Sequence, residues 1–316
     1  MVTDLSSNSN GTRCVVPPTA SLDGFASLSV PVYRASTIVF PNAAACRARG
    51  AIAGRLYLWP RWNAHNESAR GTTRGNSPAA RSIIVPSGQA AITTVMLALL
   101  NHGDHLLIAD NVYPPVKLFA RTILQSFGAE IEYFDPTDPT DLDARIRPGV
   151  TKLVWVESPG STTMEICDIL AIAARCRKAG AFLGCDNTWA TGLLCKPLNL
   201  VVDIVAEAVT KYAGGHSDIH LRAIILNELD LYARFGALGS LGEGVSPDDC
   251  SHALRGIQTM TLRLRHAGAL SEQFAHRLES AGFAVLHPCL PSFSGHALCN
   301  VSLRLFWGFH PPPTER

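Results

Sequence analysis

The sequence has little net charge, no long apolar run and no closely spaced cysteine pair. Charged residues make up 17% of the 316 residues, and the net charge is +1. Proteins that bind nucleic acid normally carry a clustered basic excess, so this balance argues against such a partner. The longest apolar run, around residues 95–100, ends at Asn101-His102-Gly103-Asp104. It falls well short of the roughly 20 residues that a membrane span requires.

The nine cysteines are scattered, without a Cys-x-x-Cys spacing and without a cluster of histidines that would bind a metal. This pattern argues against a metal site and indicates reduced thiols, which are typical of the cytoplasm. Residues 1–11 are polar and lack the apolar core of a secretory signal. We expect them to form a mobile arm on a cytoplasmic protein.

Apolar residues are plentiful, at 47% of the chain, so a large core can form. The length leaves room for about two domains. From residue 82 onward, short apolar runs alternate with helix-like stretches, as in a doubly wound α/β layer. Strands are expected at residues 106–109, 130–134, 153–156, 182–184 and 204–206. Helices are expected at residues 90–100, 116–125, 169–179 and 251–285, the third ending at Gly180.

Lys211 is the residue whose surroundings point to a specific chemistry. It follows a strand-like apolar run at residues 198–205, and Asp186 follows another apolar run upstream. A lysine amine forms a Schiff base with an aldehyde cofactor, and a buried carboxylate keeps the ring nitrogen of pyridoxal phosphate protonated. The two residues could face each other across such a ring. Two plainer interpretations stay open: a solvated surface lysine, and Asp186 as the N-cap of a helix.

Several short strings occur in the order and spacing of a known family. They are Asp186-Asn187-Thr188-Trp189-Ala190-Thr191, Thr210-Lys211-Tyr212, Gly215-His216-Ser217-Asp218, Pro86-Ser87-Gly88-Gln89-Ala90-Ala91 and Glu157-Ser158-Pro159-Gly160-Ser161. Together they resemble the Cys/Met-metabolism pyridoxal-phosphate enzymes, the trans-sulfuration enzymes, and most closely their cystathionine β-lyase branch. The resemblance covers residues 28–57 and 79–298.

The resemblance implies the type I fold of pyridoxal-phosphate-dependent transferases, with a mostly parallel central sheet flanked by helices. It implies a homo-oligomer, a tetramer built from dimers, that cleaves a C–S bond in an amino-acid thioether such as cystathionine. The motifs do not separate β-elimination from γ-elimination or γ-replacement on a related thioether. The family pattern divides the chain into an N-terminal arm at 1–60, a cofactor-binding large domain at 61–250 and an incomplete C-terminal α/β subdomain at 251–316.

The resemblance also assigns roles to single residues. Lys211 would hold pyridoxal phosphate and move the α-proton of the substrate, while Asp186 would face the ring nitrogen. The amides of Gly88 and Gln89, at the start of a helix, would hold the cofactor phosphate. An ordinary helix start with Ser87 as its cap is the alternative there.

Further residues of the site follow from the same strings. Tyr113 would stack on the cofactor ring and carry protons, or else be a half-buried structural tyrosine. Thr210 matches the phosphate-binding threonine, Thr188 would support the acid of the preceding strand, and Ser161 would face the phenolic oxygen of the cofactor. Glu157 is either a solvated strand end or a residue of undefined role.

Two stretches depart from the family pattern, residues 58–78 and residues 299–316. In each, another reading frame can encode a segment similar to the family's: a tyrosine-containing loop with its helix in the first, and a Phe-x-Gly-x-Ser-Gly-x-Phe strand in the second. We therefore expect frameshifts near 58–78 and after 298, and a truncated C-terminus without the arginine that grips the substrate carboxylate. A catalytically impaired remnant is the alternative to an active lyase.

Overall fold

The structure is a computed structural model that describes residues 20–22, 25–27, 32, 41–44, 81–236 and 243–302. The expected mobile arm at residues 1–11 and the segment 58–78 lie outside the described residues, as does most of the segment after residue 298. The two frameshifts expected in these segments stay predictions.

Strands and helices alternate along the described chain. The strands are β1 Ala20–Leu22, β2 Phe25–Ser27, β3 Arg81–Val85, β4 His105–Ala109, β5 Glu130–Phe134, β6 Thr151–Glu157, β7 Phe182–Asp186, β8 Ile204–Glu207 and β9 Arg222–Leu226. The α-helices are α5 Gly88–Leu99, α6 Pro114–Phe119, α7 Pro139–Arg145, α8 Ile169–Ala179, α9 Thr191–Leu194, α10 Leu229–Gly236, α11 Pro247–Ser280 and α12 His296–Ser302. A π-helical turn, η1 Ala120–Leu124, and two 3-10 turns, η2 Gln125–Phe127 and η3 Pro197–Leu200, complete the chain.

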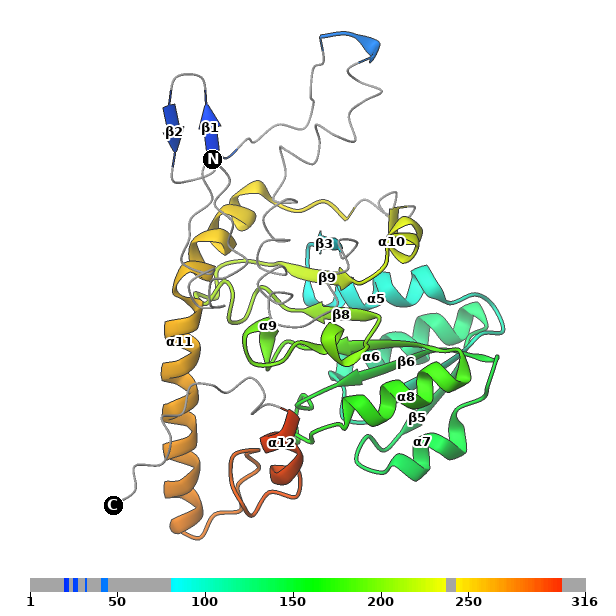
Figure 1. The fold of residues 1–316 in the computed structure, drawn as a ribbon, viewed down its shortest axis with the longest axis vertical. Helices are drawn as coiled ribbons and strands as arrows, with labels where there is room; N and C mark the ends of the chain where they lie inside the picture. Colours follow the sequence, from blue (N-terminus) through cyan, green and yellow to red (C-terminus); the bar gives the residue numbers. More distant parts are fainter. Residues whose placement is uncertain are drawn as a thin grey trace.

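The central sheet has the strand order β3-β9-β8-β7-β6-β4-β5 (Figure 1). The ladder from β8 to β5 is parallel, whereas β9 is antiparallel to both of its neighbours, β8 and β3. Parallel strands end at one edge of a sheet, where α/β proteins commonly bind their ligands. The residues that follow β3, β4, β6, β7 and β8 therefore meet at one edge, and β9 begins there.

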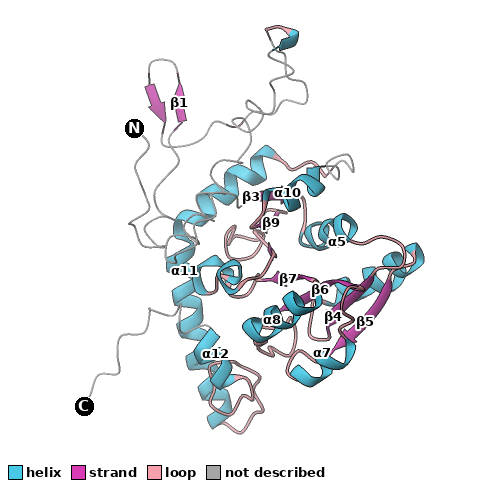
Figure 2. Ribbon diagram, turned by 45° about the vertical axis from the view of Figure 1, so that its right-hand side comes forward, coloured by secondary structure: helices cyan, strands magenta, loops and turns pink. Residues whose placement is uncertain are grey.

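Helices cover both faces of the sheet. Figure 2 shows the strands between α5 on one side and α7 with α8 on the other. On the first side α5 contacts α6 and α10, and on the second α7 contacts α8. The expected α/β architecture, with a mostly parallel sheet flanked by helices, is thereby confirmed.

The predicted strands all lie within observed ones, β4 to β8. Helix α8 ends as predicted, because Gly180 adopts the left-handed conformation (φ 72°) that terminates helices. The helix expected at 116–125 begins at Pro114 and passes into η1 after Phe119. Strands β3 and β9 were not predicted.

The run 198–205 is not the single strand that its apolar residues suggest. The turn η3 takes up its first residues, Val201 has a positive φ of 67°, and β8 begins only at Ile204. A β-branched residue rarely adopts a positive φ, so the break at Val201 has no local signal in the sequence.

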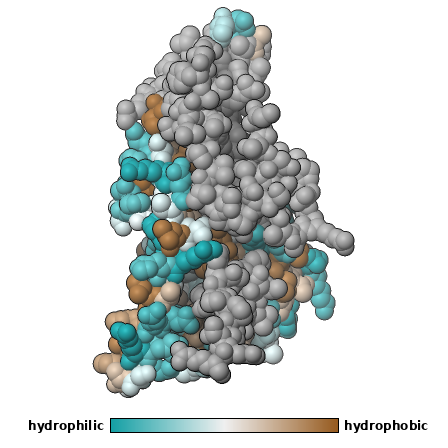
Figure 3. Space-filling view, turned by 60° about the vertical axis from the view of Figure 1, so that its left-hand side comes forward, coloured by the Kyte–Doolittle hydropathy of each residue, from teal (hydrophilic) through white to brown (hydrophobic). Residues whose placement is uncertain are grey.

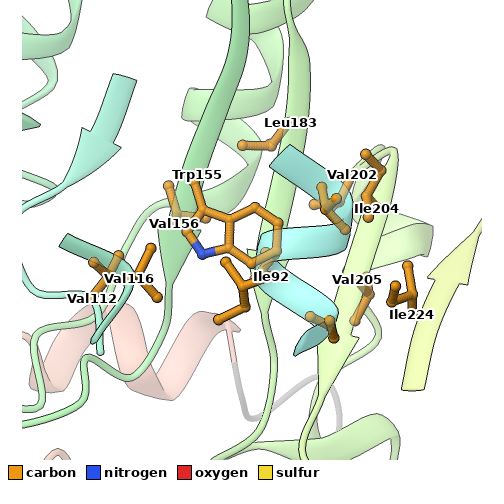
Figure 4. Packing of buried hydrophobic residues seen from close by; sticks show 14 of the residues in the cluster. Ile92, Val112, Val116, Trp155, Val156, Leu183, Val202, Ile204, Val205 and Ile224 are labelled. Carbon is orange, nitrogen blue, oxygen red and sulfur yellow. The ribbon is translucent and has the colours of Figure 1, made fainter. Parts of the chain in front are cut away.

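Trp155 of β6 is the largest fully buried side chain of the core. Figure 4 shows its indole ring beside Ile92 of α5 and among aliphatic side chains of the neighbouring strands. Trp155 is paired with Gly184 on β7, and a Cβ at Gly184 would overlap the indole ring. Gly184 therefore makes room for the large ring on the adjacent strand.

Helix α11 is 34 residues long and stands beside the sheet (Figure 1). Its Gly256 lies so close to the carbonyl oxygens of Ala213 and Gly214 that a Cβ there would overlap them. Arg263, about two turns further along the helix, donates to the carbonyl oxygen of Ala213 (3.4 Å). The helix thus packs directly on the loop that follows Lys211. No helix in the described ranges is both long and apolar enough to cross a membrane.

We expect Gly184→Ala to destabilise the fold, because the added methyl group would overlap the Trp155 ring. Overpacking of this kind costs about 1–3 kcal/mol in the free energy of unfolding. Gly268→Ala is the control, since no atom lies within 4 Å of a Cβ at Gly268 in α11. Urea unfolding followed by circular dichroism measures both variants. An unchanged midpoint for Gly184→Ala would contradict the packing argument.

Candidate active site

Three carboxylates lie at the edge where the parallel strands end. Glu157, Asp186 and Glu207 are the last residues of β6, β7 and β8, and they are 3%, 3% and 4% exposed. Buried carboxylates are costly unless they are paired, hydrogen-bonded or protonated. Perturbed ionisable groups of this kind gather at functional sites, so the edge is the candidate active site.

Asp186 is held by the turn that follows it. Its Oδ1 accepts hydrogen bonds from the Thr188 amide (3.0 Å) and the Thr188 hydroxyl (2.6 Å). The oxygen of that hydroxyl accepts a hydrogen bond from the Ala208 amide (2.9 Å). The next helix, α9, has Ala190 as its N-cap. The interpretation of Asp186 as a helix N-cap is therefore wrong, because its side chain closes a turn instead.

Arg222, the first residue of β9, is the cation that faces Asp186. Its side chain is 3% exposed, and its Nη2 forms an ion pair with Oδ2 of Asp186. Nη2 also donates to the Thr188 hydroxyl oxygen (3.3 Å), and Nη1 donates to the Gly88 carbonyl oxygen (2.9 Å). The sequence signal for Arg222 is slight: an arginine that immediately precedes the short apolar run 223–226.

Lys211 lies in the loop between β8 and β9, and its side chain is exposed. Its amine lies 5.6 Å from the centroid of the Trp189 ring, within the range of a cation–π contact. The Lys211 amide donates to the Ala208 carbonyl oxygen (3.1 Å). The Ala208 amide donates to Thr188, whose hydroxyl donates to Asp186. A chain of three hydrogen bonds therefore connects the backbone of Lys211 to the carboxylate of Asp186. The exposure of Lys211 leaves its catalytic role a prediction.

The first turn of α5 faces the same edge, because β3 runs in the same direction as β8. Ser87 caps this helix by accepting a hydrogen bond from the Ala90 amide (3.1 Å), as the capping interpretation expects. The amides of Gly88 and Gln89 belong to the first turn, whose N–H groups have no partner within the helix. Such a helix start suits an anion.

Glu157 connects the loop after β4 to the loop after β6. Its Oε2 accepts a hydrogen bond from the Tyr113 amide (2.8 Å), and its Oε1 accepts one from the Ser161 hydroxyl (2.6 Å). Burial, followed by the charge of Asp186, raises the pKa of Glu157 to about 8. The interpretation of Glu157 as a solvated strand end is therefore wrong. Tyr113, whose amide contacts Glu157, is 41% exposed.

Glu207, which was not predicted as a site residue, lies one strand further along. Burial raises the pKa of its carboxyl to about 7, while the Gly192 amide and the charge of Arg222 oppose the shift. The Asp186 charge acts in the same direction as burial. Glu207 and Glu157 thus bind protons more readily than ordinary carboxylates, and Arg222 partly offsets the effect in both.

Thr210 joins the end of β8 to the start of β9. Its hydroxyl donates to the Leu221 carbonyl oxygen (3.0 Å) and accepts from the Leu221 amide (3.1 Å). A hydroxyl has one proton to donate. In this geometry the proton is used within the protein, so the phosphate contact expected of Thr210 requires its hydroxyl to turn away from Leu221.

Comparison with known proteins identifies relatives along most of the chain. The family model of the Cys/Met metabolism PLP-dependent enzymes matches residues 12–308. A Bordetella avium protein named cystathionine beta-lyase is 34% identical over 284 residues, which cover 87% of this chain and 70% of that protein. A Herpetosiphon aurantiacus protein named "Probable cystathionine gamma-synthase" is 33% identical over 233 residues, 73% of this chain and 72% of its own.

The fold has a counterpart among solved structures. The crystal structure of metB from Corynebacterium glutamicum matches with a TM-score of 0.81 and 26% sequence identity. The match covers 95% of this chain and 77% of that chain. It confirms the type I fold that the sequence motifs imply.

The raised pKa of Glu157 predicts a pH-dependent stability. A carboxyl whose pKa rises from 4.5 to about 8 on folding stabilises the protein fully below pH 4.5, and this stabilisation is lost as pH rises through 8. The free energy of unfolding should fall by up to about 1.4 kcal/mol per pH unit in this range.

Glu157→Gln should flatten this fall, because a neutral amide keeps the hydrogen bonds to Tyr113 and Ser161 without a titrating proton. Urea unfolding at pH values from 5 to 8 measures the slope, with exposed Glu228 as the matched Glu→Gln control. Parallel profiles for Glu157→Gln and the parent chain would contradict the shift.

Proposed function

This chain belongs to the Cys/Met metabolism PLP-dependent enzymes, and we propose that it cleaves cystathionine by β-elimination into homocysteine, pyruvate and ammonia. The observation that supports this most is the shared sheet edge of Lys211 and Asp186, which the Thr188 and Ala208 hydrogen bonds connect. A basic amine and a buried acid are the two groups that the chemistry of pyridoxal phosphate requires from a protein.

The residues at this edge fit pyridoxal phosphate in most respects. The first turn of α5 offers the Gly88 and Gln89 amides to the phosphate. The Gln89 side-chain oxygen is buried without a hydrogen-bond partner among the described residues, so it can accept a hydrogen bond from a donor on a ligand. Asp186 is buried in the site, and a buried carboxylate is what a protonated ring nitrogen needs. The exception is Oδ2 of Asp186, which Arg222 already engages.

When bound, pyridoxal phosphate supplies an electron sink for the charge left on the substrate carbon after proton removal. Lys211 is the residue that we assign to take this proton, and it can do so only in its uncharged form. Tyr113, whose amide donates to Glu157, is the residue that we assign to cover the ring face and to pass a proton. Ser161, whose hydroxyl donates to the other oxygen of Glu157, is the residue that we assign to the phenolic oxygen of the cofactor.

The γ-lyase or γ-synthase reaction on a related thioether is the alternative within the same class of enzyme. It is favoured by the similarity to the Herpetosiphon aurantiacus protein and by site residues that both reactions share. Products separate the two, because β-elimination of cystathionine gives homocysteine and pyruvate whereas γ-elimination gives cysteine and 2-oxobutyrate. An impaired remnant of a frameshifted gene would release neither pair.

We further propose that the protein is a cytoplasmic homo-oligomer, a dimer or tetramer. The free thiols of the seven described cysteines support a reducing compartment. Helix α11 exposes three large apolar side chains, Leu262 at 72%, Leu270 at 51% and Phe274 at 64%. Figure 3 brings this side of the molecule forward and shows apolar residues between hydrophilic ones on the described surface. Apolar side chains repeated along one helix favour contact with another protein surface.

Lys211→Ala tests the assignment of the amine. We expect loss of the visible absorbance band of lysine-bound cofactor, and a fall in pyruvate release from cystathionine of about 1000-fold or more. Lys178→Ala is the control, because Lys178 is exposed in the last turn of α8. This turn leads into the start of β7, at the sheet edge opposite to the candidate site. A Lys211→Ala protein that retains the band would refute the assignment. Homocysteine and cysteine are measured in parallel to distinguish the two cleavages.

Light scattering coupled to size-exclusion chromatography tests the oligomer. We expect the parent protein to have a mass of two or four chains. The control Lys178→Ala, at an exposed position, should neither dissociate nor lose solubility. Phe274→Glu should shift the equilibrium toward the monomer, because a buried carboxylate at an interface costs several kcal/mol. A monomer in the parent protein at micromolar concentration would rule the proposal out.

A further inference from the structure

Arg222 is a buried cation at the candidate site, and the catalytic assignment does not use it. It is almost fully buried, and its guanidinium spans from the Asp186 carboxylate to the first turn of α5, at the Gly88 carbonyl oxygen. It lies among the groups to which the proposed function assigns the cofactor ring and phosphate. Such a residue either supports the bound ring or competes with it.

The hydrogen-bonding capacity of Asp186 distinguishes these two possibilities. Oδ1 is occupied by the amide and the hydroxyl of Thr188, and Oδ2 is occupied by Arg222. A protonated ring nitrogen needs one of these oxygens as its acceptor. The turn at Thr188 is part of the chain's own backbone, so Oδ2 is the oxygen that a ligand would have to share or take over.

We propose that Arg222 competes with the ring nitrogen of pyridoxal phosphate for the Asp186 carboxylate and thereby weakens cofactor binding in this chain. A guanidinium stays charged at every relevant pH. It therefore cancels much of the negative charge that Asp186 would otherwise offer to a ring cation. This inference rests on the proposed function, since it concerns the same site and the same cofactor.

The ion pair between Arg222 and Asp186 also affects the two nearby acids, Glu157 and Glu207. Asp186 raises the pKa of both Glu157 and Glu207, whereas the charge of Arg222 acts to lower it in both. Without Arg222, Asp186 would be a buried, uncompensated carboxylate beside two others. Removing one partner of a buried ion pair strongly destabilises a protein, because the other charge is left buried without compensation. Arg222 thus stabilises the empty site at the expense of affinity for a ring cation.

Arg222→Gln tests the competition directly. Glutamine removes the charge and keeps a hydrogen-bond donor, although its side chain ends two bonds short of Nη1, the atom that donates to the Gly88 carbonyl oxygen. We expect the dissociation constant for pyridoxal phosphate, measured by equilibrium dialysis, to fall about tenfold or more, because a charge-assisted hydrogen bond to Asp186 becomes available. Arg255→Gln, at an exposed position on α11, is the matched control and should leave the constant unchanged.

A cofactor analogue makes the test specific for the ring nitrogen. In this analogue a C–H group replaces the nitrogen, while the aldehyde and the phosphate are kept. The parent protein should prefer pyridoxal phosphate over the analogue by less than about threefold, whereas Arg222→Gln should prefer it by about tenfold or more. The parent measurement alone decides the matter if the variant does not fold: a preference of tenfold or more there would overturn the competition.

The remaining outcomes separate the competition from the proposed function. If the parent and Arg222→Gln bind pyridoxal phosphate equally well, or the variant binds it less well, Arg222 does not compete and the proposed function stands. If neither protein binds pyridoxal phosphate although both give a folded circular dichroism spectrum, the proposed function fails and the competition fails with it. Thermal unfolding adds a second readout: Arg222→Gln should melt lower when empty and gain more from saturating cofactor.

Discussion

The parallel direction of β6, β7 and β8 is the constraint on which the candidate site depends. It brings the last residues of these strands together, and the register places Glu157 directly beside Asp186. Each strand ends in an acidic residue, so the fold concentrates three carboxyl groups in a buried place. The two outer acids respond by raised pKa values, and the middle one is paired with Arg222. The antiparallel strand β9 is what delivers that cation to the same edge.

Much of the fold was predictable from local signals. The strands from β4 to β8 are short apolar runs, and Gly180 marks the end of α8 by a conformation that favours glycine. Strand β9 was not predicted, although residues 223–226 form a short apolar run of the same kind. The break at Val201 was missed because a positive φ at a β-branched residue is imposed by the surrounding structure.

The candidate site was predictable as a set of motifs but not as a set of contacts. Ser87, Lys211 and Asp186 could be found because each belongs to a recognisable string of neighbours. The partner of Asp186 could not, because Arg222 lies 36 residues further along the chain and meets it only through the order of the strands. The same holds for Glu157, whose burial depends on loops that come from elsewhere in the sequence. Pairings of distant residues are a property of the topology.

The ion pair between Arg222 and Asp186 has a consequence for the life of the polypeptide in the cell. Because the chain compensates its interior acid with its own arginine, a vitamin-derived molecule is not needed to neutralise that acid during folding. We therefore expect the polypeptide to reach its native shape while that molecule is scarce. Supply of the vitamin would then govern how many copies are loaded, and the number of copies that survive would be set by the polypeptide alone.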